Sequence, residues 1–203
     1  MNKVNFYYDG FNLYFGLRSK YDRKYLWLDL NHLSNLMLKN GQQISKIKYF
    51  SARLTKPPSK VKRQTNYIEA LESLEVIEIF YGQYLTHEHI CPKCNHKEII
   101  PTEKMTDVNI ATELLVDGFN NEFDVAIIIS ADSDLVGPIK QLKNLFPQKK
   151  IVIAFPPDRD SFELRKNANA YFRIGKQKFQ QSQFPNPVIS LKGYPLYKPE
   201  SWN

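Results

Sequence analysis

Cysteine is scarce in the sequence, and long apolar runs are missing from it. The only two cysteines among the 203 residues, Cys91 and Cys94, cannot make a disulfide-rich secreted scaffold. Asp9 interrupts the apolar stretch near the start, and no run approaches the roughly 20 residues of a transmembrane helix. Neither a signal-peptide cleavage site nor a glycine-rich nucleotide-binding loop, GxGxxG or GxxxxGK, occurs. These absences predict a cytoplasmic protein that has no membrane partner.

The overall composition is ordinary, except for an excess of positive charge. Hydrophobic residues make up 42% of the chain and charged residues 24%, which suits one globular domain with a substantial core. The formal net charge is +7 and the pI is about 9.2. That charge favours a polyanionic partner, although weakly by itself.

Strand and helix patterns alternate along most of the chain. Five consecutive apolar residues at 125–129 are too few for a helix and predict a strand buried on both faces. Further strands are expected at 3–8, 44–52, 76–81, 151–155 and 170–174, and helices at 29–39, 58–74, 135–146, 161–169 and from 106 or 107 onward. This order predicts an α/β fold with a mainly parallel sheet covered by helices on both faces. Residues 176–203 are polar and rich in proline, and we expect an extended tail there.

Carboxylates follow two of the expected strands and begin one helix. Asp9 ends the first strand, Asp132 and Asp134 follow the strand at 125–129, and Asp107 lies at a helix start. Ligands of such sheets bind beyond the carboxyl ends of the strands, where these side chains could converge. Their oxygens suit Mg²⁺ or Mn²⁺, which could activate a water for phosphodiester hydrolysis. Each aspartate taken alone also fits a helix cap or a turn.

Four short motifs resemble those of a known family. They are Asp9-Gly10-Phe11-Asn12, Glu103-Lys104-Met105-Thr106-Asp107-Val108, Ser130-Ala131-Asp132-Ser133-Asp134, and Phe162-Glu163-Leu164 with Ala168-Asn169-Ala170. Over residues 3–175 the chain resembles an NYN domain of the PIN-like nuclease superfamily, in the branch that includes LabA-like proteins. The resemblance implies a three-layer α/β/α sandwich and a divalent-metal nuclease site, usually associated with RNA. It implies metal-ligand positions at Asp9, Asp107, Asp132 and Asp134, with Asn12 and Ser130 as orienting catalytic groups.

The chain departs from the family pattern at three places. Ala131 replaces a common glycine, so the backbone there must avoid a conformation that only glycine adopts easily. Met105-Thr106 replaces a frequent Gly-Val. Asn169 stands near a position where the family often has an aspartate, and we assign it no metal role.

Basic residues are concentrated between residues 46 and 67, where no acidic residue occurs. They are Lys46, Lys48, Arg53, Lys56, Lys60, Lys62 and Arg63. We expect Arg53, Lys56, Lys60, Lys62 and Arg63 to bind nucleic acid. The alternative is a solvated helix face. Four aromatic residues near the first loop could stack on bases, although such residues more often belong to the core: Tyr14, Phe15, Tyr21 and Tyr25.

A cluster of histidines and cysteines lies within an insert at residues 82–101. His87, His89, Cys91 and Cys94 could form a tetrahedral zinc site, with His96 as an alternative ligand. Such a zinc would hold the insert together rather than take part in the reaction. The alternatives are a redox-inert pair of thiols, or exposed histidines beside a solvent loop.

Three functions fit the acidic and basic residues together. The first is a divalent-metal-dependent nuclease, expected to be an endoribonuclease. The second is an RNA-binding or regulatory adaptor on a nuclease-like fold, without significant turnover. The third is a phosphatase that uses the same acidic pocket, although only one aspartate, Asp9, stands where a phosphatase nucleophile motif would have two. The sequence leaves open whether the substrate is RNA or DNA, how many metal ions bind, and what the oligomeric state is.

Overall fold

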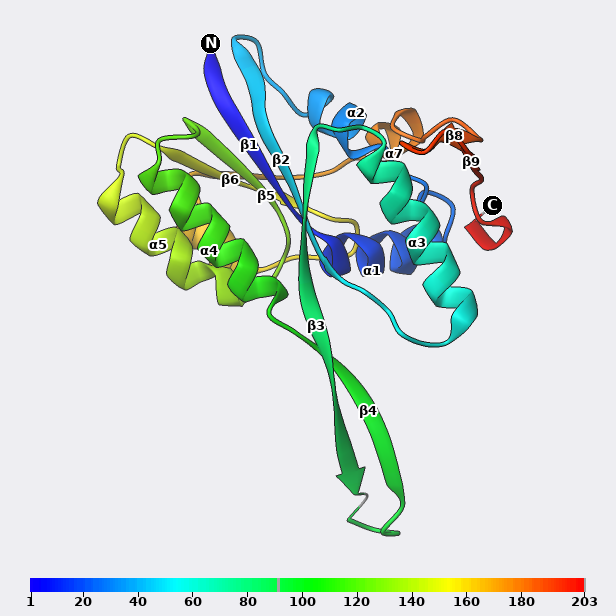
Figure 1. Ribbon diagram of the computed structural model, residues 1–203. Helices are drawn as coiled ribbons and strands as arrows, with labels where there is room; N and C mark the ends of the chain where they lie inside the picture. Colours follow the sequence, from blue (N-terminus) through cyan, green and yellow to red (C-terminus); the bar gives the residue numbers. More distant parts are fainter. Residues whose placement is uncertain (91, 203) are drawn as a thin grey trace.

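The computed structural model describes residues 1–90 and 92–202, without the side chains of residues 86, 87, 89 and 99–101 (Figure 1). Strands and helices alternate as the sequence predicts. In chain order, the elements are β1 (Asn2–Asp9), α1 (Gly10–Tyr21), α2 (Leu30–Asn35), β2 (Gln42–Ala52), α3 (Pro58–Glu72), β3 (Ile77–Ile90), β4 (Lys97–Lys104), α4 (Thr106–Phe119), β5 (Val125–Ile129), the 3₁₀ helix η1 (Ser133–Leu135), α5 (Val136–Leu145), β6 (Lys150–Phe155), α6 (Phe162–Asn167), β7 (Ala170–Arg173), α7 (Lys176–Gln181), β8 (Val188–Ile189), β9 (Pro195–Leu196) and the 3₁₀ helix η2 (Glu200–Trp202).

Seven of the described strands form one large sheet in which β1 lies at the centre. Within residues 1–90 and 92–202 its order is β4-β3-β2-β1-β5-β6-β7, and all neighbouring strands are parallel except β3 and β4. The chain moves outward from β1 to β2 and β3 on one side, and from β5 to β6 and β7 on the other. The strand order therefore reverses between β1 and β5, which is where such sheets bind ligands. This sheet confirms the predicted α/β fold.

Helices cover both faces of the sheet and make it a three-layer sandwich (Figure 1). Successive residues of β1 point to opposite faces, so Tyr8 packs with Leu17 of α1 and Leu33 of α2, while Tyr7 packs with Leu114 of α4. Helices α3 and α7 join the first face, and α5 and α6 join the second. No helix within the described part of the chain combines the length and the apolar character needed to cross a membrane.

The end of the chain differs from the extended tail that we expected. Residues 176–202 contain α7 and the small β8–β9 hairpin. Phe179, Phe184 and Trp202 are buried in the core beside α1 and α2, and the indole nitrogen of Trp27 donates a hydrogen bond of 3.0 Å to the carbonyl oxygen of Pro185. The prediction of an extended surface tail was wrong because these apolar residues are too widely spaced to show a helix or strand period.

The predicted insert at 82–101 is mostly regular structure. Beyond Gly82, β3 pairs only with β4, and the two strands form a long hairpin that projects from the body (Figure 1). Cys94 and His96 are exposed in its turn. Cys91 and the side chains of His87 and His89 lie outside the described residues, so the zinc site stays a prediction.

Candidate functional site

Asp9 lies at the point where the strand order reverses, and three donors hold its carboxylate. The residue ends β1 and caps α1, with only 2% of its surface exposed. Asn12 donates to it through its backbone N–H (3.0 Å) and its side-chain amide (2.6 Å), and the Ser130 hydroxyl donates from the end of β5 (2.8 Å). Burial raises the pKa of Asp9, while these hydrogen bonds act in the opposite direction. The predicted orienting groups, Asn12 and Ser130, are therefore in contact with Asp9.

Helix α1 can begin directly beside β2 only because residue 10 is glycine. A Cβ atom at Gly10 would lie 2.6 Å from the carbonyl oxygen of Phe50 and 2.7 Å from the hydroxyl oxygen of Tyr49. These distances are too short for non-bonded atoms, so a larger residue would push Asp9 and α1 away from the sheet.

The turn after β5 is tied to the same network. The backbone N–H of Asp132 donates to the Ser130 hydroxyl (3.0 Å), and that of Ala131 donates to the Asn12 side-chain oxygen (3.3 Å). The carboxylate of Asp132 caps η1 by accepting from the backbone N–H of Asp134 (2.9 Å). Ala131 does not have a positive φ, so the loss of the family glycine causes no strain there. Asp132 is partly buried, whereas Asp134 is exposed.

Asp107, unlike the other three aspartates, is contributed by the first turn of α4. Burial and, in decreasing order of strength, the charges of Asp132, Asp9, Glu103 and Asp134 together raise the pKa of Asp107 to about 7. Asp107 thus lies close enough to the other aspartates to be repelled by them. Glu103 itself accepts hydrogen bonds from the backbone N–H and the hydroxyl of Thr106, at the start of α4.

The four aspartates have no ion-pair partner in the part of the chain that the structure describes. Among the described residues, none of Asp9, Asp107, Asp132 and Asp134 has an ion pair with a lysine, arginine or histidine. In the same part of the chain, no group of three carboxylate, histidine or cysteine side chains is arranged to hold a metal ion as it stands. The chemistry of the donors nevertheless fits a hard divalent cation, because all are carboxylate oxygens and a cation would relieve their mutual repulsion.

Asn169 is not part of this site. Its side-chain oxygen accepts a hydrogen bond of 2.9 Å from the backbone N–H of Ile151, near the start of β6. Asp9 lies at the carboxyl end of β1, so Asn169 and Asp9 are at opposite ends of the parallel strands. This agrees with giving Asn169 no metal role.

The predicted basic residues divide into two groups. Lys46 and Lys48 point to the α4 face, where the buried Lys48 lies 2.7 Å from Glu113 and 2.8 Å from Asp117, so they are not part of a basic surface. Lys56, Lys60 and Lys62 are exposed on or before α3, and Arg63 is partly buried. Arg53 stacks on Tyr81 and donates to its hydroxyl (2.8 Å).

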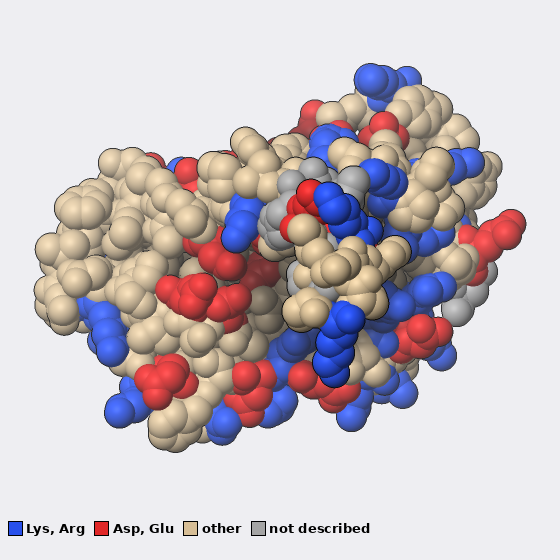
Figure 2. Space-filling model, turned by 90° about the horizontal axis from the view of Figure 1, so that it is seen from below, with Lys and Arg blue, Asp and Glu red and all other residues tan. Residues whose placement is uncertain are grey.

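Acidic and basic side chains lie on different sides of the hairpin when the carboxyl ends of the strands face the reader. Figure 2 shows carboxylates gathered beside the hairpin and mainly lysine and arginine side chains on its other side.

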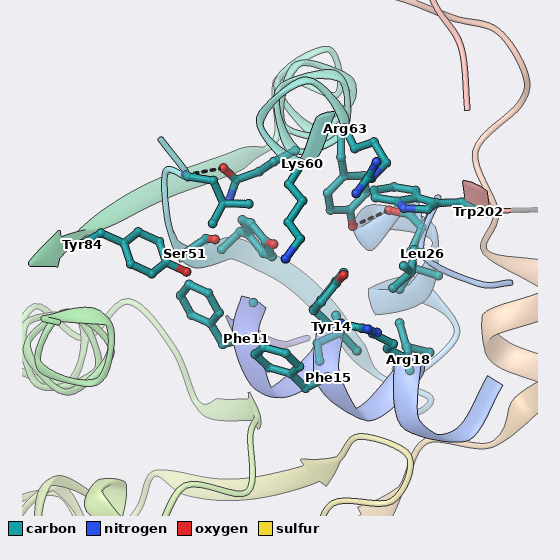
Figure 3. Close-up of a pocket in the computed structure, with 18 residues that line it drawn as sticks. Phe11, Tyr14, Phe15, Arg18, Leu26, Ser51, Lys60, Arg63, Tyr84 and Trp202 are labelled. Atoms are coloured by element: carbon teal, nitrogen blue, oxygen red, sulfur yellow. Dashed lines mark hydrogen bonds between the residues drawn. The ribbon is translucent and has the colours of Figure 1, made fainter. Parts of the chain in front are cut away.

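The sequence did not lead us to a cavity of about 250 Å³ between α1 and α3. Figure 3 shows its walls, which are mainly aromatic and aliphatic and include Phe11, Tyr14, Leu26, Tyr84 and Trp202. The spacing of Phe11, Tyr14, Phe15 and Arg18 places them on one side of α1 and is the signal that could have pointed to this cavity.

The fold and the site define a class of protein: an α/β domain whose parallel sheet carries an acidic cluster at the reversal of strand order. Residues 3–175 match the family described as the NYN domain, and the chain belongs to that family. Membership implies a PIN-like nuclease fold.

Two further comparisons place the chain among known proteins. It is 27% identical to 6-hydroxy-3-succinoylpyridine 3-monooxygenase HspA of Pseudomonas putida (strain DSM 28022 / S16), over 98% of this chain and 75% of that protein. Its fold is similar to the crystal structure of a protein of unknown function from Vibrio parahaemolyticus RIMD 2210633, with a TM-score of 0.60 and 19% identity over 86% of this chain and 94% of the other.

Proposed function

We propose that the chain is a cytoplasmic, divalent-metal-dependent endoribonuclease. The observation that carries the proposal is the set of Asp9, Asp107 and Asp132 carboxylates, which repel one another and have no cationic partner among the described residues. Such an arrangement is costly unless a cation binds there. The family to which the chain belongs supports phosphodiester hydrolysis as the chemistry.

Asp9, Asp107, Asp132 and Asp134 would hold Mg²⁺ or Mn²⁺. A bound divalent cation lowers the pKa of its water and offsets charge on the phosphate. Asn12 and Ser130 hold Asp9 in one orientation through their hydrogen bonds. The backbone of the Ser130–Asp132 turn is fixed by the same two side chains, so Asp9 and Asp132 are positioned together.

RNA would approach along α3. Lys56, Lys60, Lys62 and Arg63 attract phosphates, and binding through them should weaken as salt concentration rises. Arg53 is the least suited of the five predicted residues, because Tyr81 and Glu72 already engage its guanidinium.

A cleavage assay tests the proposal. Single-stranded RNA, duplex RNA and single-stranded DNA are incubated with the protein in Mn²⁺, in Mg²⁺ or in a chelator. We expect RNA cleavage that needs the cation and falls more than about 100-fold in an Asp132→Asn/Asp134→Asn variant. Asp22→Asn/Glu98→Gln removes two exposed carboxylates outside the cluster and serves as the matched control.

The outcomes separate the alternatives. Equal RNA cleavage by wild type and the Asp132→Asn/Asp134→Asn variant, or no cleavage by either, would contradict the assigned site. RNA binding without cleavage would favour the adaptor function. Release of phosphate from a phosphomonoester alone would favour the phosphatase.

A second candidate function is the activity named for the Pseudomonas putida relative, which acts on a pyridine carrying hydroxyl and succinoyl groups. The aromatic cavity beside Phe11 favours it, because that cavity suits a single ring system. A monooxygenase consumes O₂ and a reductant. Oxygen consumption that depends on 6-hydroxy-3-succinoylpyridine and a reduced nicotinamide would support this candidate, and no consumption with both present would exclude it.

A further inference from the structure

The cavity between α1 and α3 has aromatic walls contributed by distant parts of the chain. Tyr14 lies on α1, Tyr84 on the hairpin and Trp202 in η2 (Figure 3). Tyr67, on α3, also lines the cavity. The rings of Phe11 and Tyr84 meet edge to face with their centroids 6.2 Å apart, and those of Tyr67 and Trp202 are 5.9 Å apart. These walls present flat apolar surfaces of the kind on which a planar ring stacks.

Three cations border the same cavity. Lys60 extends from α3 into the cavity, Arg63 lies beside it, and Arg18 lies on the α1 wall (Figure 3). Within residues 1–90 and 92–202, no hydrogen bond, ion pair or ring contact engages the side-chain nitrogens of these residues, and no carboxylate lines the cavity. The cavity therefore combines apolar walls with uncompensated positive charge.

The walls are held in place without a ligand. The side chain of Gln64 is bonded to the backbone at the end of β2. It accepts from the backbone N–H of Leu54 (2.8 Å) and donates to the carbonyl oxygen of Ala52 (2.8 Å). The Tyr67 hydroxyl donates to the carbonyl oxygen of Leu28 (2.9 Å), and Trp202 is almost fully buried. Preformed walls reduce the entropy lost on binding, as is typical of a true ligand site.

We propose that this cavity binds a ligand made of one planar aromatic ring and an anionic group. The ring would stack among Tyr14, Tyr67 and Tyr84, and the anion would take hydrogen bonds from Lys60, Arg63 and Arg18. The volume of about 250 Å³ is below the range of about 300–1,000 Å³ for drug-sized ligands, so the part of the ligand inside the cavity is limited to one aromatic ring system with a short substituent.

Two sources supply this chemistry, a nucleotide of an RNA chain and a free aromatic acid. The cavity begins at Gly10 and Phe11, immediately after Asp9 in the chain. A nucleotide bound there would lie next to the acidic cluster and would position the chain for cleavage. The binding itself does not rest on the proposed nuclease function, because the cavity contains none of the clustered aspartates.

Calorimetric titrations in a chelator, without divalent cations, test the proposal separately from cleavage. The probes are AMP, UMP and pyridine-3-carboxylate, with inorganic phosphate, succinate and uridine as comparisons that lack either the ring or the charge. We expect at least one aromatic anion to bind more than about tenfold tighter than these comparisons, because it uses both the walls and the cations. Stronger binding of AMP or UMP identifies the RNA nucleotide, and stronger binding of pyridine-3-carboxylate identifies the free aromatic acid.

Two variants assign binding to the cavity. Lys60→Gln/Arg63→Gln should weaken it roughly tenfold or more, because hydrogen bonds to charged groups contribute at least that factor. Tyr14→Leu should weaken it by roughly five- to a hundredfold through lost stacking. Lys39→Gln/Lys140→Gln, which removes two exposed charges elsewhere, should bind as wild type does, and circular dichroism verifies that each variant folds.

The proposal is overturned if no aromatic anion binds, if phosphate and succinate bind as tightly as the ring-bearing anions, or if neither cavity variant changes the affinity. Because no metal is present, a failure of RNA cleavage leaves this result unaffected. Conversely, ligand binding without RNA cleavage would uphold the cavity and contradict only the proposed nuclease function.

Discussion

Replacing Asp107 by asparagine should remove a destabilising, pH-dependent contribution from the metal-free protein. Asp107 ionises at a pKa of about 7 in the folded chain, because it is partly buried and faces Asp132 and Asp9. In the unfolded chain it ionises near its ordinary value of 3.8. The folded state therefore binds a proton more tightly, and its stability falls as pH rises from about 4 through 7.

The size of the effect follows from that difference in pKa. A rise from 3.8 to about 7 corresponds to at most about 4 kcal/mol, at about 1.36 kcal/mol per pKa unit. Asp107 is only partly buried, and solvent screens its interactions, so we expect about 1–2 kcal/mol. The free energy of unfolding of the variant, minus that of the wild type, should thus be about 1–2 kcal/mol larger at pH 8 than at pH 4.

Urea unfolding of both proteins in a chelator, at several values between pH 4 and pH 8, measures the difference. Glu98→Gln, which removes an exposed carboxylate on the hairpin, is the control for the loss of one negative charge. Adding Mn²⁺ should then reverse the order of stability of the two proteins. The wild type gains stability with increasing Mn²⁺ and Asp107→Asn gains less, because a ligand stabilises the state that binds it.

A difference between the Asp107→Asn and wild-type profiles that stays constant from pH 4 to pH 8 would refute the electrostatic account of the site. The same holds if Glu98→Gln reproduces the pH dependence, because the effect would then come from net charge rather than from the cluster.

Three further predictions concern stability and can be measured by the same unfolding method. Met105 adopts a left-handed conformation (φ 79°) before α4, so Met105→Gly should stabilise by about 1 kcal/mol; no gain would mean that the strain is absent. Lys48→Met should lower the free energy of unfolding by about 3–5 kcal/mol, because it leaves the buried Asp117 without its nearest cation. An unchanged free energy of unfolding would contradict the buried ion pair. Trp202→Ala should cost about 3 kcal/mol through lost contacts with Trp27 and Tyr67, and an unchanged stability would contradict the packed tail.

Much of the fold could be predicted because local signals agree with burial. The run at 125–129 is a strand buried along its whole length, and Asp29 caps α2 by accepting from the backbone N–H of His32 (2.8 Å). Helix α2 ends at Asn35, earlier than expected. The backbone N–H of Met37 donates to the carbonyl oxygen of Ser34, three residues back, rather than to a residue four back as in an α-helix. Apolar periodicity continues through that tighter turn, so it does not mark the end of the helix.

Other features depend on contacts between distant residues, which periodicity does not record. The described side chains of the hairpin beyond Gly82 are largely solvent-exposed, so its strands lack the apolar alternation of buried ones. Lys48 is buried because Asp117, far along the chain, lies opposite it. The aromatic cavity likewise needs Trp202 beside Tyr67.

The candidate site could be placed because Asp9 and the Ser130–Asp134 turn end neighbouring parallel strands. The hydrogen bonds of Asn12 and Ser130 to Asp9 agree with the orienting role that the resemblance implied. The left-handed backbone at Met105 gives a physical reason for the glycine that belongs to the family pattern which the chain resembles.

Anomalous diffraction from crystals soaked in Mn²⁺ tests the central claim most directly, because it locates the cation without reference to turnover. We predict a strong peak among the carboxylates of Asp9, Asp107 and Asp132, and none there in crystals of an Asp107→Asn/Asp132→Asn variant. Mn²⁺ peaks only elsewhere on the wild-type protein, or no peak at millimolar Mn²⁺, would contradict the claim.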